Sequence, residues 1–231
     1  QPIERELQIT RGVLEVLLAW RHPVQIVTKS ASILRDLDLL TELAAHELVV
    51  VDISLTTLDP ALARGMEPRA SAPGRRLDAI RALADAGVPA GVATAPIIPG
   101  LTCHEIERLL GAAAEAGATT ADYVLLRLPH ELRELFDDWL AVHHPHRRAR
   151  VLSLVRQSRG GRLNDPRFDS RMRGDGPVAT LIRERFMKAC ARCGLARRDQ
   201  RRLRTDLFAP PEARRQGDLF APATEVAREN G

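Results

Sequence analysis

Short apolar segments alternate with amphipathic ones along the first part of the chain, and this alternation limits the fold more than any other feature. Four apolar segments begin roughly thirty residues apart, the spacing of consecutive β-α-β units. The predicted strands are 24–28, 48–54, 88–94 and 122–128. The predicted helices are 10–20, 33–45, from Pro73 up to Gly87, and from Ile106 up to Gly117. This order indicates an α/β fold in which a parallel sheet has right-handed crossovers.

The predicted sheet starts after a helix and holds four strands, as in the second part of a barrel. Its central segment is apolar from Val49 to Val51 and again at Ile53, which is typical of a strand buried on both faces. The first strand has no earlier partner, and such a strand leaves an unpaired edge. Because the chain also begins with Gln1 rather than Met, we expect it to be truncated at its N-terminus.

The alternation of strands and helices stops after Pro129. Residues 130–157 predict helices broken at 143–146, and a last helix is predicted at 181–193. The final segment is rich in Pro, Ala and charged residues, a composition typical of disorder. We therefore expect three parts: a partial barrel at 1–129, a helical, arginine-rich extension at 130–204, and a disordered tail at 205–231.

The composition bounds the environment of the protein. The chain is 45% hydrophobic, which is enough for one sizeable core. No apolar run approaches the ~20 residues of a membrane span, and the first residues do not form a signal peptide. Three cysteines are too few for a disulfide framework, which favours a reducing compartment. We expect a cytoplasmic protein with no membrane partner.

The charge is distributed unevenly. Residues 147–204 hold 18 basic and 5 acidic residues, whereas the whole chain has a net charge of only +4. A basic block on an acidic body indicates a polyanionic partner such as nucleic acid. The alternative is a general arginine bias, because Lys29 and Lys188 are the only lysines.

Polar residues follow the predicted strands at the end where α/β folds bind ligands. We expect a ligand site at this edge, although each residue alone could be a cap or turn residue. Lys29 could hold a carboxylate as a point charge or form a Schiff base. The residues at the four strand ends are Lys29 and Ser30; Ser54, Thr56 and Thr57; Thr94 and Pro96; and Arg127.

Other candidate groups are weaker. Cys190 and Cys193 are two residues apart, but a metal site needs further ligands and there is no second pair. Cys103 stands alone, and the histidines at 143–146 surround a proline in an expected turn. We therefore predict no metal ligands in this chain. Thr102 and Glu105 have the spacing of a capping box for the helix that follows.

Several stretches, in their order and spacing, resemble the radical S-adenosylmethionine (radical SAM) superfamily, and within it the branch related to spore photoproduct lyase. They cover most of residues 1–195. The matching stretches are Val24–Ser30, Asp52–Thr57 with Glu67–Arg69, Ala95–Leu101, Tyr123–Pro129, Arg159–Arg162 with Asn164–Pro166, and Met172–Gly174.

The resemblance implies a partial (β/α)6 barrel in which a [4Fe-4S] cluster, fed by an electron donor, cleaves S-adenosylmethionine to a 5′-deoxyadenosyl radical. It implies that Lys29, next to Ser30, pairs with the methionine carboxylate. Ser54, near Thr56, would hydrogen-bond the ribose or amino end. The segment from Ala95 and Pro96 to Gly100 would line the adenine, with Tyr123 to Arg127 beside it.

The departure from the family concerns the cluster. Members bind it through Cys-x3-Cys-x2-Cys, and no cysteines here have that spacing. We expect those ligands upstream of Gln1, so that this chain alone neither holds the cluster nor catalyses. The catalytic residues, including the hydrogen relay, are not assigned.

Three functions are compatible with the sequence. The first is a radical SAM enzyme, with lyase or DNA-repair-like chemistry implied by the branch. The second is a Schiff-base barrel lyase that uses Lys29. The third is a non-catalytic binding fragment, because Gln216, Leu219 and Phe220 resemble the bacterial motif that docks on the replication sliding clamp, and a disordered peptide can order on a groove.

Overall fold

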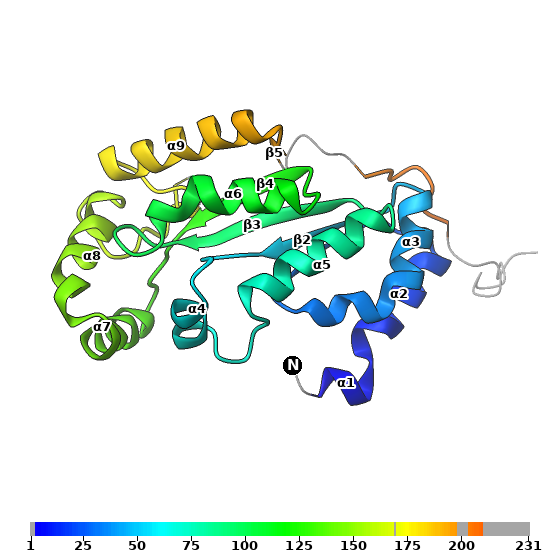
Figure 1. Cartoon of the computed structure of the whole chain (residues 1–231), viewed down its shortest axis with the longest axis horizontal. Helices are drawn as coiled ribbons and strands as arrows, with labels where there is room; N and C mark the ends of the chain where they lie inside the picture. Colours follow the sequence, from blue (N-terminus) through cyan, green and yellow to red (C-terminus); the bar gives the residue numbers. More distant parts are fainter. Residues whose placement is uncertain (1–2, 169, 198–202, 210–231) are drawn as a thin grey trace, which may run out of the picture.

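A parallel sheet runs through the protein, with helices along it and a helical extension at one end (Figure 1). The structure is a computed structural model that describes residues 3–168, 170–197 and 203–209. In chain order the elements are α1 (Glu4–Leu7), α2 (Ile9–Ala19), β1 (Val24–Thr28), the 3-10 helix η1 (Ala31–Asp36), α3 (Leu37–Ala45), β2 (Val49–Ser54), α4 (Pro60–Met66), α5 (Pro73–Asp85), β3 (Ala90–Ile97), the 3-10 helix η2 (Cys103–Glu105), α6 (Ile106–Glu115), β4 (Thr120–Leu125), α7 (Leu132–His143), α8 (Pro145–Gln157), α9 (Pro177–Cys193) and β5 (Ala196–Arg197).

The four expected strands are confirmed as β1 to β4, all parallel. β1 has the expected bounds, and β2 begins one residue late at Val49. β3 starts at Ala90 because the preceding Pro89 has no backbone N–H for the ladder. β4 ends at Leu125 rather than at 128, so the last residues of the expected strand form a loop.

A fifth strand, β5, lies beside β4 and completes the order β1-β2-β3-β4-β5. It pairs Ala196 with Thr120 and Arg197 with Ala121. Two residues are too few to show a hydrophobic period, so this strand could not be predicted from the sequence. The sheet is open among the described residues, and its mixed α/β architecture is that of a partial barrel without closure.

The main core lies between the sheet and the helices on one of its faces. Val51 and Ile53 of β2 and Val92 of β3 pack there with Leu83 of α5 and Leu110 of α6. All six positions of β2 are buried, as expected for a central parallel strand. α3, α5 and α6 contact β2 or β3 directly and lie in front of the strands in Figure 1.

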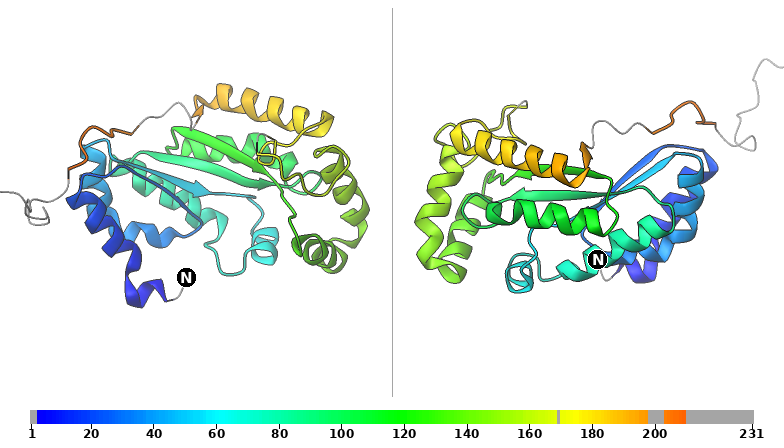
Figure 2. Two further views of the ribbon diagram at one scale, coloured as in Figure 1. Left: turned by 180° about the vertical axis from the view of Figure 1, so that it is seen from behind. Right: turned by 45° about the horizontal axis from the view of Figure 1, so that its top comes forward.

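The opposite face of the sheet carries small and polar side chains. Asp52, Gly91 and Thr120 occupy paired positions on three adjacent strands, and the Gln25 amide donates to Asp52 Oδ2 at 2.9 Å. Val27, on the same face of β1, is 52% exposed. Seen from behind, the strands lie in front of α5 and α6 (Figure 2), so this face is the more open one.

The expected break between two helices at 143–146 is confirmed, because α7 ends at His143 and α8 begins at Pro145. Leu140 of α7 and Val151 of α8 form a small second core with Ile98, which follows β3. α9 begins at Pro177, earlier than expected, and packs along α6. Within the described ranges, no helix has both the length and the apolar character required to cross a membrane.

The capping box expected at Thr102 and Glu105 is wrong. Thr102 Oγ1 accepts a hydrogen bond from the Ile98 amide at 2.9 Å instead of capping the next helix. The buried Glu105 carboxylate accepts from the Thr57 hydroxyl at 3.0 Å and from the Leu58 amide at 2.7 Å. Spacing alone did not separate a cap from this tertiary contact, which fixes the loop after β2.

Candidate functional site

The carboxyl ends of β1, β2 and β3 meet at one edge of the sheet, and three predicted site residues lie there: Lys29, Ser54 and Ala95. The structure links them through Glu67 and Arg76, which follow in the segments after β2. We call these five residues, together with Ser71, the Arg76 network.

Glu67 is the bridge of this network. Its Oε1 lies 2.5 Å from Lys29 Nζ, and its Oε2 lies 2.6 Å from Arg76 Nη2. The Lys29 side chain is 44% exposed, whereas that of Glu67 is 11% exposed and that of Arg76 only 1%. Lys29 is therefore the end of the network that a ligand from solvent can reach.

Arg76 holds the backbone at the edge of the sheet. Its Nε donates to the Ser71 carbonyl at 2.7 Å and its Nη1 to the Ser54 carbonyl at 2.9 Å. Burying a guanidinium is costly unless its donors are satisfied. Here Glu67 supplies the counter-charge, and the two carbonyls accept the remaining hydrogen bonds. The end of β2 is thus fixed to the start of α5.

The ends of the other two strands join the same network. The Ser54 hydroxyl donates to the Ala95 carbonyl at 3.2 Å, which ties β2 to β3. The Ser71 amide donates to the Lys29 carbonyl at 3.2 Å, and the Ser71 hydroxyl accepts from the Ala31 amide at 2.9 Å. Three strand ends are therefore held together by hydrogen bonds before any ligand binds.

Thr56 lies just beyond β2 and is 4% exposed. Its hydroxyl has no hydrogen-bond partner among the described residues. A buried unpaired hydroxyl costs about 1–3 kcal/mol unless something else satisfies it. Because Thr56 follows the end of β2, this orphaned hydroxyl fits an edge that binds a polar ligand.

Tyr123 does not join the other predicted site residues. Its ring lies on the helix-covered face, 4.6 Å from the ring of Phe186 between centroids, and the guanidinium of Arg173 lies 4.5 Å from its centroid. Burial raises the pKa of the Tyr123 phenol. The side chain belongs to the packing between β4 and α9.

Pro96 and Arg127 lie in a separate groove between the sheet edge and α7, together with Trp139. Pro96 directly follows Ala95, so the groove adjoins the Arg76 network. The edge therefore has a polar part at β1 and β2 and an apolar part at β3 and β4.

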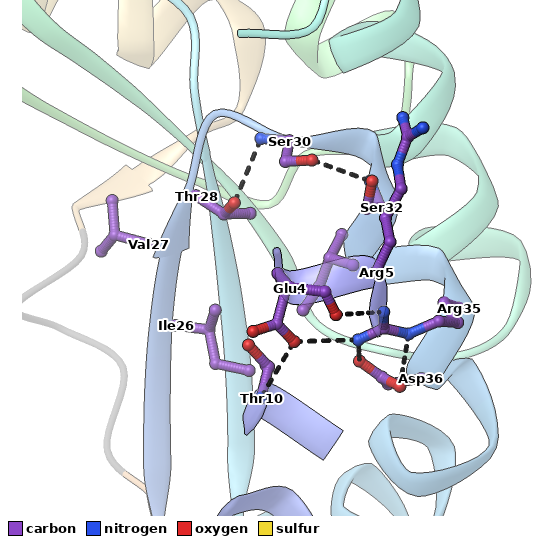
Figure 3. A pocket seen from close by; sticks show the side chains of 11 residues that line it. Glu4, Arg5, Thr10, Ile26, Val27, Thr28, Ser30, Ser32, Arg35 and Asp36 are labelled. Atoms are coloured by element: carbon purple, nitrogen blue, oxygen red, sulfur yellow. Dashed lines mark hydrogen bonds and ion pairs between the residues drawn. The ribbon is translucent and has the colours of Figure 1, made fainter. Parts of the chain in front are cut away.

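Ser30 lines a cavity of about 230 Å³ beside β1 (Figure 3). Three of the four charged residues that line it are paired, because Arg35 binds Glu4 and Asp36 at 3.0 and 3.2 Å, while Arg5 also lines the cavity. The Ser30 hydroxyl accepts from the Ser32 amide at 3.1 Å and caps η1.

The cysteines of this chain do not fit an iron–sulfur cluster. Cys103 lies at the start of η2, while Cys190 and Cys193 lie on α9. Burial raises the pKa of the Cys190 thiol to about 11, the opposite of what a thiolate ligand requires. Within the part of the chain that the structure describes, no three His, Cys, Asp or Glu residues form a possible metal site.

Sequence reasoning assigned no role to Glu67 or Arg76. Arg76 was detectable in principle, because it shares helical spacing with Ala79, Ile80 and Leu83 on the buried side of α5. A charged residue on an apolar stripe indicates a buried ion pair. The spacing could not identify Glu67 as its partner, because Glu67 lies in the loop before α5 and follows no helical period.

Comparison with known proteins identifies relatives that are themselves uncharacterized. One, of Mycobacterium tuberculosis, is 36% identical over 159 residues, or 68% of this chain and 47% of that protein. Another, of Methanocaldococcus jannaschii, is 31% identical over 101 residues, or 44% of this chain and 38% of that protein. A third, of Acidianus two-tailed virus, is 37% identical over 90 residues, or 39% of this chain and 29% of that protein.

The chain thus spans about half the length of the mycobacterial relative. No solved structure gives a significant match. Residues 4–113 match the model of the radical SAM superfamily. This stretch contains β1 to β3 and the whole Arg76 network.

Proposed function

We propose that this chain carries the S-adenosylmethionine-binding edge of a radical SAM enzyme. The observation that supports it is the Arg76 network, which arranges three strand ends around an exposed lysine inside the region that matches the superfamily. Carboxylates bind where a cation and short polar donors are held in place beforehand.

In this proposal Lys29 holds the methionine carboxylate as a point charge. The hydroxyls of Ser54 and Thr56 meet the ribose or amino end, and the unpaired hydroxyl of Thr56 gains a partner. Ala95 and Pro96 line the adenine. S-adenosylmethionine bound to a reduced [4Fe-4S] cluster supplies a 5′-deoxyadenosyl radical, the chemistry that the superfamily implies.

The cluster ligands belong, in our proposal, to sequence upstream of Gln1. The three cysteines of this chain do not fit the cluster, so we derive no step through it here. Reading the coding sequence in frame before Gln1 tests this. A Cys-x3-Cys-x2-Cys segment supports it, and extended protein purified without oxygen should then contain iron and sulfide. A stop codon directly before Gln1 contradicts it.

The binding edge is tested with this chain itself, because its only two lysines form a matched pair. Lys29→Gln should weaken S-adenosylmethionine binding about tenfold, the loss of one charge-assisted contact. Lys188→Gln removes an exposed charge on α9 and should leave the dissociation constant unchanged. Calorimetry measures both. Equal affinity of the two variants, or no binding by the unaltered chain, contradicts the proposal.

The Schiff-base alternative has less support from the geometry. A Schiff-base lysine is activated by desolvation, whereas Lys29 is 44% exposed and paired with Glu67. Borohydride trapping of a carbonyl substrate on Lys29 would favour that alternative over ours.

A nucleic-acid substrate, with lyase or repair-like chemistry, is a finer proposal supported by the basic block at 147–204. On α8 the exposed Arg147, Arg150 and Arg156 form no ion pair with a carboxylate among the described residues. Binding of a fluorescent oligonucleotide should fall steeply with added salt and weaken in the triple glutamine variant. The clamp-docking residues Gln216, Leu219 and Phe220 lie outside the described residues, so docking stays a prediction.

A further inference from the structure

The groove beside α7 has a cavity volume of about 300 Å³ and adjoins the proposed cofactor edge. Its walls are mostly apolar and come from β3, the loop after β4, and α7. Leu132 and Leu135 of α7 are 44% and 59% exposed there, so they add apolar surface to the groove. The residues used below are Pro96, Arg127, Leu132, Leu135, Phe136 and Trp139, and we call this site the α7 groove.

One wall of the α7 groove is aromatic. The rings of Phe136 and Trp139 lie nearly parallel, with centroids 5.9 Å apart and an interplanar angle of 13°. The Trp139 indole N–H donates to the Gly65 carbonyl at 3.2 Å, which fixes the ring between α7 and α4. A fixed aromatic wall favours a planar unsaturated group by stacking.

The α7 groove also contains a cation that no carboxylate neutralises. Arg127 Nη1 approaches only the Met172 sulfur, at 3.9 Å, and the Arg127 Nε is buried without a partner in the described structure. Neighbouring arginines differ: Arg148 is paired with Asp137 and Arg173 with Asp122, both at 2.5 Å. The charge of an anionic occupant therefore has a ready complement in Arg127.

We propose that the α7 groove binds a planar aromatic group bearing a carboxylate or phosphate, with the ring against Phe136 and Trp139 and the anion on Arg127. The idea that this ligand is the substrate of the reaction rests on the proposed function. The idea that the groove binds such a ligand does not depend on the proposed function. Pro96 is shared between groove and edge, so an occupant lies next to the residues proposed to hold the adenine.

Trp139 provides a direct reporter of occupancy. Trp20 is the only other tryptophan and packs against Phe208 away from the groove, so Trp20→Phe leaves Trp139 as the sole indole. Iodinated arenes quench an indole that they touch. The anionic probes are 4-iodobenzoate, for a free aromatic acid, and 5-iodo-2′-deoxyuridine 5′-monophosphate, for a nucleotide. Their neutral counterparts are 4-iodobenzamide and 5-iodo-2′-deoxyuridine.

At least one anion should quench Trp139 with saturation and bind about tenfold more tightly than its neutral counterpart. Arg127→Gln should remove that preference while leaving neutral binding unchanged. Leu135→Asp should weaken both probes of the preferred pair. Arg108→Gln, which removes an exposed charge on α6, is the matched control and should behave as the parent. The anion that binds more tightly identifies the source of the ligand.

The assignment is overturned if both anions quench with saturation but bind no more tightly than their neutral counterparts. It is also overturned if an anion still binds more tightly than its neutral counterpart in the Arg127→Gln variant. Absence of quenching by all four probes also overturns it. None of these measurements uses the cluster or S-adenosylmethionine. Failure of the groove proposal is therefore distinguishable from failure of cofactor binding at Lys29.

Discussion

Arg76 illustrates how one side chain can organise a site at the residue scale. It satisfies two carbonyls and one carboxylate, from β2 and from the loop between α4 and α5, while being 1% exposed. Its removal would leave Glu67 nearly buried with only the exposed Lys29 as counter-charge. The Arg76 side chain therefore contributes more to stability through the whole hydrogen-bond network than any one of its hydrogen bonds would contribute alone.

Arg76→Met should lower the free energy of unfolding by about 3 kcal/mol, because the Ser54 and Ser71 carbonyls lose their donor and Glu67 keeps only the exposed Lys29 as its counter-charge. Adding Glu67→Gln to that variant should recover part of the loss. Arg81→Met, on the exposed side of the same helix, should change stability by less than about 0.5 kcal/mol. Urea unfolding followed by circular dichroism measures all three, and a similar cost for the two arginines would refute the role of Arg76.

Cys190 should make stability depend on alkaline pH. Burial raises the pKa of its thiol to about 11 from 9.0, so between those values the folded state keeps a proton that the unfolded state releases. The free energy of unfolding should therefore be unaffected below pH 9 and fall as pH rises toward 11. Cys190→Ala should show a shallower fall in urea titrations over that range. Parallel curves would disprove it, since Tyr123 titrates in both proteins.

At the scale of elements, the sequence allowed prediction wherever a local period decided the structure. The β-branched runs predicted β1 and β2, and the pattern from Pro73 to Gly87 predicted α5. Contacts between distant segments could not be predicted from the sequence. These are the pairing of β5 with β4, the hydrogen bonds of the buried Glu105 to Thr57 and Leu58, and the ion pair of Glu67 with Arg76. Of the predicted site, Lys29, Ser54 and Ala95 meet, whereas Tyr123 faces the helices.

Gly91 marks a close approach between β2, β3 and β4 that only a residue without Cβ permits. A methyl group there would collide with the side chains of Asp52 and Thr120. Gly91→Ala should destabilise by about 1–3 kcal/mol. Gly111→Ala, in α6 where a Cβ meets nothing within 4 Å, should stabilise by about 0.5–1 kcal/mol. Thermal unfolding distinguishes the two, and shifts of the same sign would show that the strands can separate at Gly91.

At the scale of the whole molecule, the two edges of the sheet differ. Beyond the carboxyl end of β4, Arg159 donates to the Leu125, Leu126 and Arg171 carbonyls, and the Leu125 amide donates to the Met172 carbonyl. The two-residue strand β5 pairs with the amino end of β4, so β4 is covered on this side. At the other edge, β1 pairs with β2 alone within the described ranges. The backbone of β1 is therefore open to another strand.

Val27→Lys should reduce self-association of the chain, because a charge on an open edge strand opposes pairing. The valine is 52% exposed on β1, while Val142 is 76% exposed on α7. Val142→Lys therefore serves as a control that adds the same charge to a helix. Sedimentation velocity measures the concentration dependence. Equal behaviour of the two variants would exclude β1 as the contact.

A sheet with one covered and one open edge also has a consequence in terms of symmetry. Two copies that pair through β1 use the same surface on both, which is a twofold, self-closing contact. On the far side of each sheet, Arg159 covers the carboxyl end of β4 and β5 pairs with the amino end of β4, so the twofold contact would be made by β1 alone. Association through β1 would therefore use the β1 edge of both copies and join them as a pair.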